Sequence, residues 1–234
     1  MVTIRSVTPP AASEADGETR SGEKPKPPTR LVLVRHAVTP ETGPKLTGRA
    51  PGVDLSADGV TQAKATALRL AEVPIAAIYA SPIERATQTA ELIASHHDLE
   101  VRAEPGVLEA DYGDWTGGKI ADLAKTDEWK TVQVAPSRAG FPNGETITAM
   151  QARVVAALDE LVVAHAHETI VVVSHADPIK AAIAHYTGVH LDLFQRIAVS
   201  PASVACFEFH SFGVMLLKLN DTGSLEPLVE TQDS

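Results

Sequence analysis

Two histidines, two arginines and a glutamate stand where the chain leaves an apolar run or enters a turn. Arg35 and His36 come directly after a run of leucines and valines, and Arg85 lies one turn into a predicted helix. Glu109 precedes a turn-rich segment, and His175 follows a second apolar run. If the apolar runs are neighbouring strands of one sheet, these five side chains meet at one edge of it, although they are far apart in the sequence.

This set of side chains suits chemistry on a phosphoryl group. The substrate is an anion, so the nucleophile should be uncharged at neutral pH, and imidazole fits because its ordinary pKa is near 6.5. Arginine presents a planar fork that matches phosphoryl oxygens. A second imidazole can donate to an equatorial oxygen, and a partly buried carboxylic acid can protonate the leaving alkoxide. With cations and acid from the protein, the chemistry requires no metal ion.

Each of the five residues also has an ordinary structural interpretation when taken alone. Arg35 and His36 fit a surface loop, and Arg85 fits an ion pair with a neighbouring carboxylate. His175 fits a buried core histidine, and Glu109 a solvated charge. The functional interpretation rests on their joint occurrence at corresponding strand ends.

Sequence motifs of other phosphate-binding and hydrolytic sites are missing. There is no GxxxxGKS or GxxxxGKT loop and no aspartate cluster suited to magnesium. The pairs His96-His97 and His165/His167 lack the i, i+4 spacing of a helical metal pair. Ser174 has no GxSxG motif around it. We therefore predict no metal site and no cofactor.

Short apolar runs alternate with segments of helical periodicity. Strands are predicted over residues 31–34, 75–80, 100–103 and 169–174, with a terminal hairpin of 203–209 and 214–220, and helices over 59–71, 81–95, 144–164 and 177–186. This alternation predicts an α/β fold with three layers, α/β/α, in which helices cover both faces of a mostly parallel sheet. Ligands bind at the carboxyl edge of such sheets.

Three predicted helices have start signals in the sequence. The segment Ser81-Pro82-Ile83-Glu84 reads as a capping box with proline at the first helical position. Asp177-Pro178 reads as a second cap followed by proline, and Ser56 or Asp58 as the cap of the helix 59–71. Because the helices at 81 and 177 begin at the predicted edge, their backbone N–H groups would also face an anion.

Composition favours one globular domain that acts on a small molecule. The chain has 234 residues, of which 44% are hydrophobic, and a formal net charge of −10. This charge repels nucleic acid and anionic membranes, so the expected partner is a small phosphorylated metabolite. The single cysteine, Cys206, excludes an internal disulfide, and we expect a cytoplasmic protein. A homodimer is left open.

The expected domain spans residues 30–221. The proline-rich residues 1–29 and residues 222–234 are expected to be tails, because they offer little that could be buried. The first tail contains basic residues but no apolar h-region, so it does not read as a secretory signal.

Five ordered motifs resemble the histidine phosphatase superfamily, also called phosphoglycerate-mutase-like, and span about residues 30–220. The first and third are the most specific: the family has Arg-His-Gly-x-Thr and Ser-Pro-x-x-Arg-x-x-Gln-Thr-Ala at these points. The matching segments here are Arg35-His36-Ala37-Val38-Thr39, Leu46-Thr47-Gly48-Arg49 with Leu55-Ser56-Ala57-Asp58-Gly59, Ser81-Pro82-Ile83-Glu84-Arg85-Ala86-Thr87-Gln88-Thr89-Ala90, Leu108-Glu109 with Tyr112-Gly113-Asp114-Trp115-Thr116-Gly117, and Ser174-His175-Ala176.

The resemblance implies a phosphoglycerate-mutase-like fold and a role for each matching residue. His36 would be the phosphorylated nucleophile and Glu109 the proton donor. Arg35, Arg85 and His175 would complete the phosphate pocket. Substrate contacts would also come from Thr39, Arg49 and Ala176. The segments 112–117, 141–145 and 191–197 are similar to a group labelled probable phosphomutases.

Two residues depart from the family pattern. Ala37 and Ala176 stand where the family has a glycine after each histidine. If either position needs a positive φ or a close approach of the backbone to phosphate, alanine would cost roughly 1 kcal/mol or crowd the ligand. Asp177 next to Ala176 also puts a carboxylate near a phosphate site, which is tolerable as a helix cap.

The expected function is metal-independent hydrolysis of a phosphomonoester through phosphate on His36. A phosphoglycerate-mutase-type transferase is the first alternative. It would need a closed cap and cations for a substrate carboxylate, and residues 110–143 lack the arginine pairs of the mutases. A binder of phosphorylated ligands without turnover is the second alternative, motivated by Ala37 and Ala176.

Overall fold

The computed structural model describes residues 26–223, so most of both predicted tails lies outside the described residues. Its centre is a six-stranded sheet in the order β3-β2-β4-β1-β5-β6. Strands β1 to β4 pair in parallel, while β5 runs antiparallel to β1 and β6 antiparallel to β5. The strands are β1 Thr29–Arg35, β2 Ile75–Ala80, β3 Val101–Ala103, β4 Thr169–Ser174, β5 Val204–His210 and β6 Gly213–Asp221.

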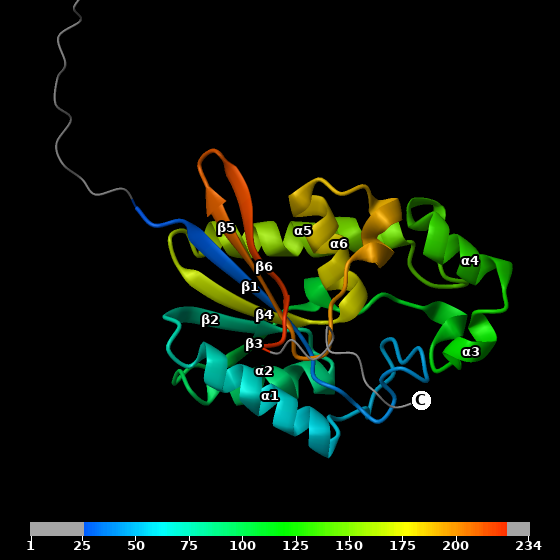
Figure 1. Ribbon diagram of the computed structural model, residues 1–234, viewed down its shortest axis with the longest axis horizontal. Helices are drawn as coiled ribbons and strands as arrows, with labels where there is room; N and C mark the ends of the chain where they lie inside the picture. Colours follow the sequence, from blue (N-terminus) through cyan, green and yellow to red (C-terminus); the bar gives the residue numbers. More distant parts are fainter. Residues whose placement is uncertain (1–25, 224–234) are drawn as a thin grey trace, which may run out of the picture.

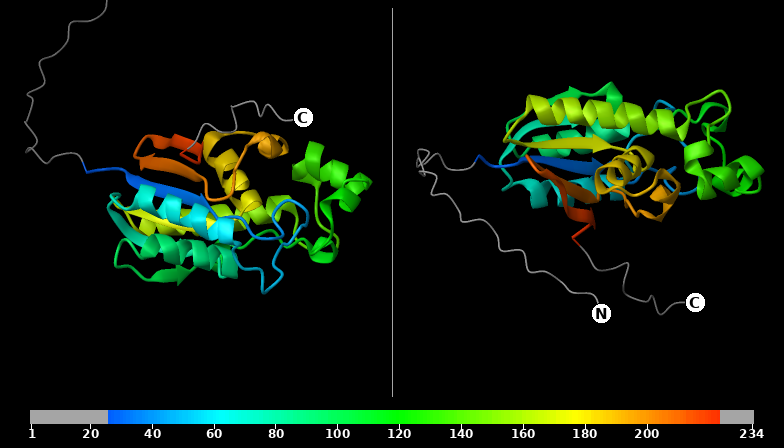
Figure 2. Two further views of the ribbon diagram at one scale, coloured as in Figure 1. Left: turned by 60° about the horizontal axis from the view of Figure 1, so that its bottom comes forward. Right: turned by 90° about the horizontal axis from the view of Figure 1, so that it is seen from above.

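Helices cover both faces of this sheet, because alternate residues of each central strand point to opposite sides. Leu31 and Leu33 of β1 pack with α5 (Ile147–Ala164) and α6 (Ala176–Thr187). Val32 and Val34 pack on the other side with α1 (Ala57–Leu70) and α2 (Glu84–Ala94). Figure 1 shows the two helix pairs on either side of the strands, and Figure 2 shows the same layers from other directions. The predicted three-layer α/β/α fold is confirmed.

Only one of the three predicted helix starts is correct. Ser56 caps α1, because its hydroxyl accepts a hydrogen bond from the Gly59 N–H at 3.0 Å. Helix α2 instead begins at Glu84 after Ile83, which makes no side-chain cap, and α6 begins at Ala176 after His175. The residues expected as caps have other contacts: the Ser81 hydroxyl lies 2.8 Å from His175 Nε2, and Asp177 accepts from Tyr112.

Beyond the carboxyl ends of the strands lies a group of short helices that the sequence did not predict (Figure 1). These are α3 Ile120–Leu123 and α4 Asp127–Val134, with 3-10 turns at Pro105–Val107, Gly113–Trp115, Pro136–Arg138 and Leu191–Arg196. They are too short to show a helical apolar period, since α4 buries only Val132 and α3 buries no residue. Together they stand over one end of the sheet.

None of the helices between residues 26 and 223 has both the length and the apolar character to cross a membrane.

Candidate active site

His36 lies at the carboxyl end of β1 and is almost fully buried. Its Nδ1 is 2.7 Å from the Ala37 carbonyl oxygen, which can only accept, so this nitrogen bears the proton. Its Nε2 accepts a hydrogen bond from Arg85 Nε at 3.1 Å. Burial lowers the pKa of His36 well below its usual value, and Arg85 and Arg35 lower it further. The ring is therefore neutral at pH 7, with an unprotonated nitrogen available as a nucleophile.

His175 lies beside His36 because their strands are neighbours. Strands β1 and β4 pair in parallel with Arg35 opposite Ser174, so the next residue of each strand leaves the sheet at the same height. The two ring centroids are 5.1 Å apart, edge to face. Burial lowers the pKa of His175 well below its usual value, and electrostatic coupling to His36 and the charge of Arg85 lower it further. The predicted convergence of these two imidazoles is thus present.

The two arginines enter from different elements. Arg35 ends β1 and donates to the Val199 carbonyl at 2.7 Å, while Arg85, in the first turn of α2, donates to the Gly48 carbonyl at 2.7 Å. Burial lowers the pKa of both groups, yet a guanidinium stays protonated in a protein. The hydroxyl of buried Thr89 accepts from the Ala37 N–H and donates to the Arg85 carbonyl, so one side chain ties the two segments together.

Three buried nitrogens at this point have no hydrogen-bond partner. They are Arg35 Nε, Arg85 Nη1 and His175 Nδ1, and among residues 26–223 the only other buried side-chain atom in this state is His97 Nε2. Leaving a buried donor unpaired costs roughly 1–3 kcal/mol, so native proteins seldom retain several in one place. Two cations with unused donors and an imidazole nitrogen without a partner, around one nucleophilic nitrogen, form a site for an anion with several oxygens.

Glu109 faces the same site with a carboxyl group suited to giving up a proton near neutral pH. Burial raises its pKa to about 7, assisted by the charge of Asp177, while Arg85 and Arg35 act in the opposite direction. Asp177 Oδ2 accepts from the Tyr112 hydroxyl at 2.9 Å, which fixes that second carboxylate beside the pocket. A general acid at neutral pH needs this kind of environment.

A cavity of about 330 Å³ opens from these residues toward the short helices. Its inner end is formed by Arg35, His36, Arg85 and Glu109. Its outer end is lined by side chains from several surface elements, namely Lys45, Trp129, Gln133, Lys180 and Gln195. This volume suits a small ligand with one charged group at the inner end.

Three other predicted substrate contacts differ in their placement. Thr39 and Ala176 line the cavity. Arg49 is absent from its lining and instead donates to the Glu109 backbone carbonyl at 2.8 Å. Neither Ala37 nor Ala176 has a positive φ, so alanine introduces no strain of that kind at the two departures from the family pattern.

The sequence interpretation missed the residues of the outer end. Lys180 Nζ lies 3.0 Å from Gln195 Oε1 and 3.7 Å from Asp177 Oδ1, and it lies over the Phe194 ring at 5.8 Å from the centroid. Gln195 was noted only within a motif, and Lys180 follows a helix start with no motif of its own. In the sequence, only the spacing of Lys180 and Gln195 from His175 could have indicated their place, and spacing does not show where a side chain points. Within residues 26–223 no group of three or more histidine, cysteine or acidic side chains could hold a metal ion.

Comparison with known proteins identifies a family of enzymes to which this chain is similar. The sequence profile described as "Histidine phosphatase superfamily (branch 1)" matches residues 31–222. Phosphoserine phosphatase 1 of Hydrogenobacter thermophilus is 33% identical over 198 residues, which cover 82% of this chain and 92% of that protein. A bifunctional protein of Mycobacterium tuberculosis is 31% identical over 206 residues, and the match spans only 55% of its length.

Solved structures of one enzyme show the same fold with small phosphorylated ligands. A mutant phosphoserine phosphatase of Entamoeba histolytica in complex with phosphoserine superposes with a TM-score of 0.77 and 26% identity, covering 84% of this chain and 99% of that one. The phosphoserine phosphatase of the same organism in complex with 3-phosphoglyceric acid has a TM-score of 0.74 and 26% identity, covering 82% and 97%.

Proposed function

The chain belongs to the histidine phosphatase superfamily, branch 1, and we propose that it hydrolyses small phosphomonoesters through phosphate held on His36. The match over residues 31–222 confirms the family predicted from the sequence motifs. The assignment of each step to a side chain rests on the geometry of the inner end.

One observation supports the proposal most strongly: buried nitrogens without a hydrogen-bond partner lie around the unprotonated nitrogen of His36. Oxygens of a phosphoryl group would accept from Arg35 Nε, Arg85 Nη1 and His175 Nδ1. The phosphorus would then lie close to His36 Nε2, with its charge compensated by protein groups alone. A metal ion is not required for this arrangement.

The reaction has two steps. His36 Nε2 attacks phosphorus, the bond between phosphorus and the ester oxygen breaks, and Glu109 gives its proton to the departing alkoxide. Water then attacks the phosphorus of phosphohistidine, the Glu109 carboxylate takes a proton from that water, and the phosphorus–nitrogen bond breaks. Inorganic phosphate leaves, and the enzyme regains its starting protonation state.

The outer end favours a substrate whose leaving group bears a carboxylate. The Lys180 side chain is only 17% exposed, so an anionic group that reaches its ammonium would meet a half-sheltered cation beside the Gln195 amide. Phosphoserine and 3-phosphoglycerate, the ligands of the solved relatives, have this pattern. We propose this class as the first to test, and the expected cytoplasmic location stays a prediction.

The test is acid-quenched labelling with a ³²P-phosphomonoester in the presence of EDTA. A phosphatase forms acid-labile phosphohistidine and releases inorganic phosphate, and His36→Ala loses both. Transfer between the 2- and 3-positions of phosphoglycerate primed with the bisphosphate would favour a mutase instead. Binding without label or product would favour a non-catalytic role. Full turnover by His36→Ala would exclude the mechanism.

A further inference from the structure

The backbone around Glu109 has no strand or helix of its own to hold it. The 3-10 turn ends at Val107, and the next regular element begins at Gly113. A general acid has to present its carboxyl within hydrogen-bond reach of the leaving oxygen. The Ala110 N–H donates to Glu109 Oε1 at 3.0 Å, so the direction of the carboxyl depends on how this stretch of backbone is held.

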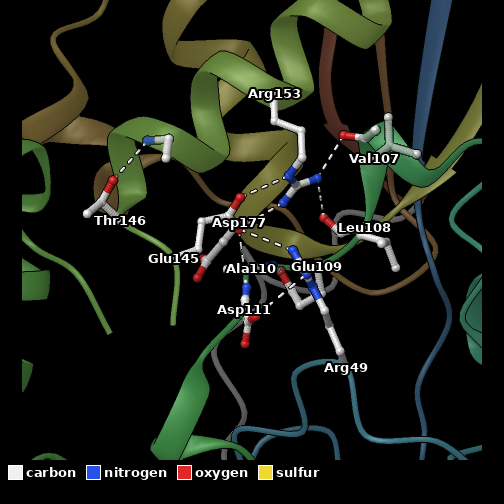
Figure 3. A network of polar contacts seen from close by, with 12 residues as sticks. Arg49, Val107, Leu108, Glu109, Ala110, Asp111, Glu145, Thr146, Arg153 and Asp177 are labelled. Atoms are coloured by element: carbon white, nitrogen blue, oxygen red, sulfur yellow. Dashed lines mark hydrogen bonds and ion pairs between the residues drawn. The ribbon is translucent and has the colours of Figure 1, made fainter. Parts of the chain in front are cut away.

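Two guanidinium groups bind the carbonyl oxygens of this segment. Arg153 Nη1, from α5, donates to Gly106 at 2.8 Å and to Leu108 at 3.2 Å. Arg49 Nε, from the loop after β1, donates to the Glu109 carbonyl at 2.8 Å. The two side chains approach from opposite sides, as Figure 3 shows.

Glu145 joins the two guanidinium groups into one cluster. Its carboxylate binds Arg153 through both oxygens at 2.9 Å and reaches Arg49 Nη2 at 3.3 Å. It also accepts from the Asp111 N–H at 3.2 Å, so it holds the segment on the far side of Glu109 (Figure 3). Charge-assisted, bidentate bonds of this kind set direction as well as energy. We name Arg49, Glu145 and Arg153 the carboxyl clamp.

The carboxyl clamp does not touch the substrate cavity. None of its three residues lines the cavity, although Glu109 does. The bonds of the clamp meet the backbone at residues 106, 108, 109 and 111, on both sides of the acid. Its contacts therefore reach the chemistry through the backbone that bears Glu109, while the pKa of His175, lowered mainly by burial, is lowered further by the charge of Arg153.

We propose that Glu145 is a positioning residue for the proton donor, acting through Arg49 and Arg153 to aim the carboxyl of Glu109 at the leaving oxygen. This inference rests on the proposed role of Glu109. It departs from the interpretation of Arg49 as a substrate contact.

The test compares leaving groups that differ in their need for a proton. Glu145→Gln keeps the size of the side chain and removes its charge. We expect its kcat/KM for phosphoserine, an alkyl ester, to fall about 10- to 100-fold. Its kcat/KM for p-nitrophenyl phosphate, which releases a stable anion, should stay within about threefold of the parent enzyme, because kcat/KM reports the transfer to His36 and not the later hydrolysis of phosphohistidine. Glu160→Gln, an exposed change on the same helix, is the matched control and should alter neither rate.

A double-mutant cycle separates positioning from general structural damage. In a Glu109→Gln background, Glu145→Gln should add almost nothing to the loss with phosphoserine, because the acid is already gone. An equal loss with both esters, additive losses in the cycle, or no loss with phosphoserine would each overturn the proposal. If Glu109→Gln itself shows no difference between the esters, the assigned proton donor is wrong, and that failure is seen without the Glu145 variants.

Arg49→Gln provides a second variant should Glu145→Gln fold poorly, because Arg49 is one-third exposed and lies at the rim of the cluster. A positioning role predicts a lower kcat for phosphoserine at nearly constant KM. A raised KM for both esters would instead make Arg49 a substrate contact and overturn its place in the carboxyl clamp.

Discussion

The inner and outer ends of the cavity are built in different ways. The inner end combines neighbouring strands, the first turn of a helix and the segment that bears Glu109, and its residues His36, Arg85 and Glu109 are buried. The outer end combines a loop, the short helix α4, a 3-10 turn and Lys180 of α6, and Lys45 and Gln133 are exposed there. One end is fixed by the sheet, while the other depends on surface segments.

Because the two ends are built differently, they suit different roles in the reaction. Charge stabilisation needs donors that do not move, and the buried inner end supplies them. Choice of leaving group needs contacts that can vary without disturbing the sheet, and loops supply these. Removal of a phosphate-binding cation at the inner end should therefore lower kcat/KM for every substrate, whereas changes at the outer end should alter KM for some substrates only.

Arg85→Ala should have the largest effect of the variants considered below. It removes a cation beside the phosphoryl group and a hydrogen bond to His36 Nε2. We expect kcat/KM to fall about 1,000-fold or more for all phosphomonoesters. Steady-state kinetics with phosphoserine and p-nitrophenyl phosphate would measure it, with the melting temperature as a check on folding. A loss of kcat/KM below tenfold would contradict the assignment of charge stabilisation to the inner end.

Glu109→Gln should have a large effect that depends on the leaving group. We expect about a 100-fold loss of kcat/KM with phosphoserine and little loss of kcat/KM with p-nitrophenyl phosphate. The pH dependence has the same origin: with a pKa of about 7, Glu109 loses its proton above neutral pH, so the rate with alkyl esters falls there. If the rate with p-nitrophenyl phosphate falls above neutral pH in the same way, the alkaline limb of the pH profile belongs to a group other than Glu109.

The sequence predicted the inner end better than the outer end for a physical reason. His36 and His175 follow strands that are buried on both faces, and such strands are continuous apolar runs that can be recognised without a structure. The parallel pairing then brings their ends together. Trp129 reaches the cavity from the short helix α4, and Lys180 reaches it from α6. Which polar side chain of a helix faces the cavity depends on tertiary contacts that the apolar period does not encode.

The same contrast explains the two wrong helix starts. Ser81 and Asp177 have the residue type and position of caps, and local rules alone assign them to the backbone. In the folded chain their side chains meet His175 and Tyr112, which lie far away in sequence. The carboxyl clamp escaped prediction for a similar reason: Arg153 lies away from the apolar stripe of α5, and its partners lie on other segments.

Asp177→Asn tests how the wall of the cavity tunes the inner end. The charge of Asp177 raises the pKa of Glu109, so its removal should lower that pKa. The alkaline limb of the rate with phosphoserine should then move to lower pH, by less than about one unit. A pH profile of kcat/KM measures the shift. Movement to higher pH would contradict the electrostatic assignment.

Lys180→Ala should affect substrate choice more than chemistry. Loss of a charged hydrogen bond to a carboxylate should raise KM for phosphoserine about tenfold, with kcat changed less than about threefold. Phosphoethanolamine, which lacks the carboxylate, is the matched substrate and should bind the variant and the parent equally. An equal rise in KM for both substrates would mean that Lys180 does not bind the carboxylate of the leaving group.

Ala37→Gly should give the smallest effect and tests whether the inner end needs the residue that departs from the family pattern. Ala37 has no positive φ and is buried with Ala63 and Ala202, so glycine removes packing and adds freedom to the unfolded chain without relieving strain. We expect a loss of about 0.5–1 kcal/mol in the free energy of unfolding and a lower melting temperature. Because the Ala37 N–H and carbonyl oxygen bond to Thr89 and His36 through the backbone, these contacts survive the change and kcat should stay within about twofold. A large gain in kcat would show instead that the methyl group crowds the phosphoryl group, and that the fixed geometry of the inner end restrains the reaction.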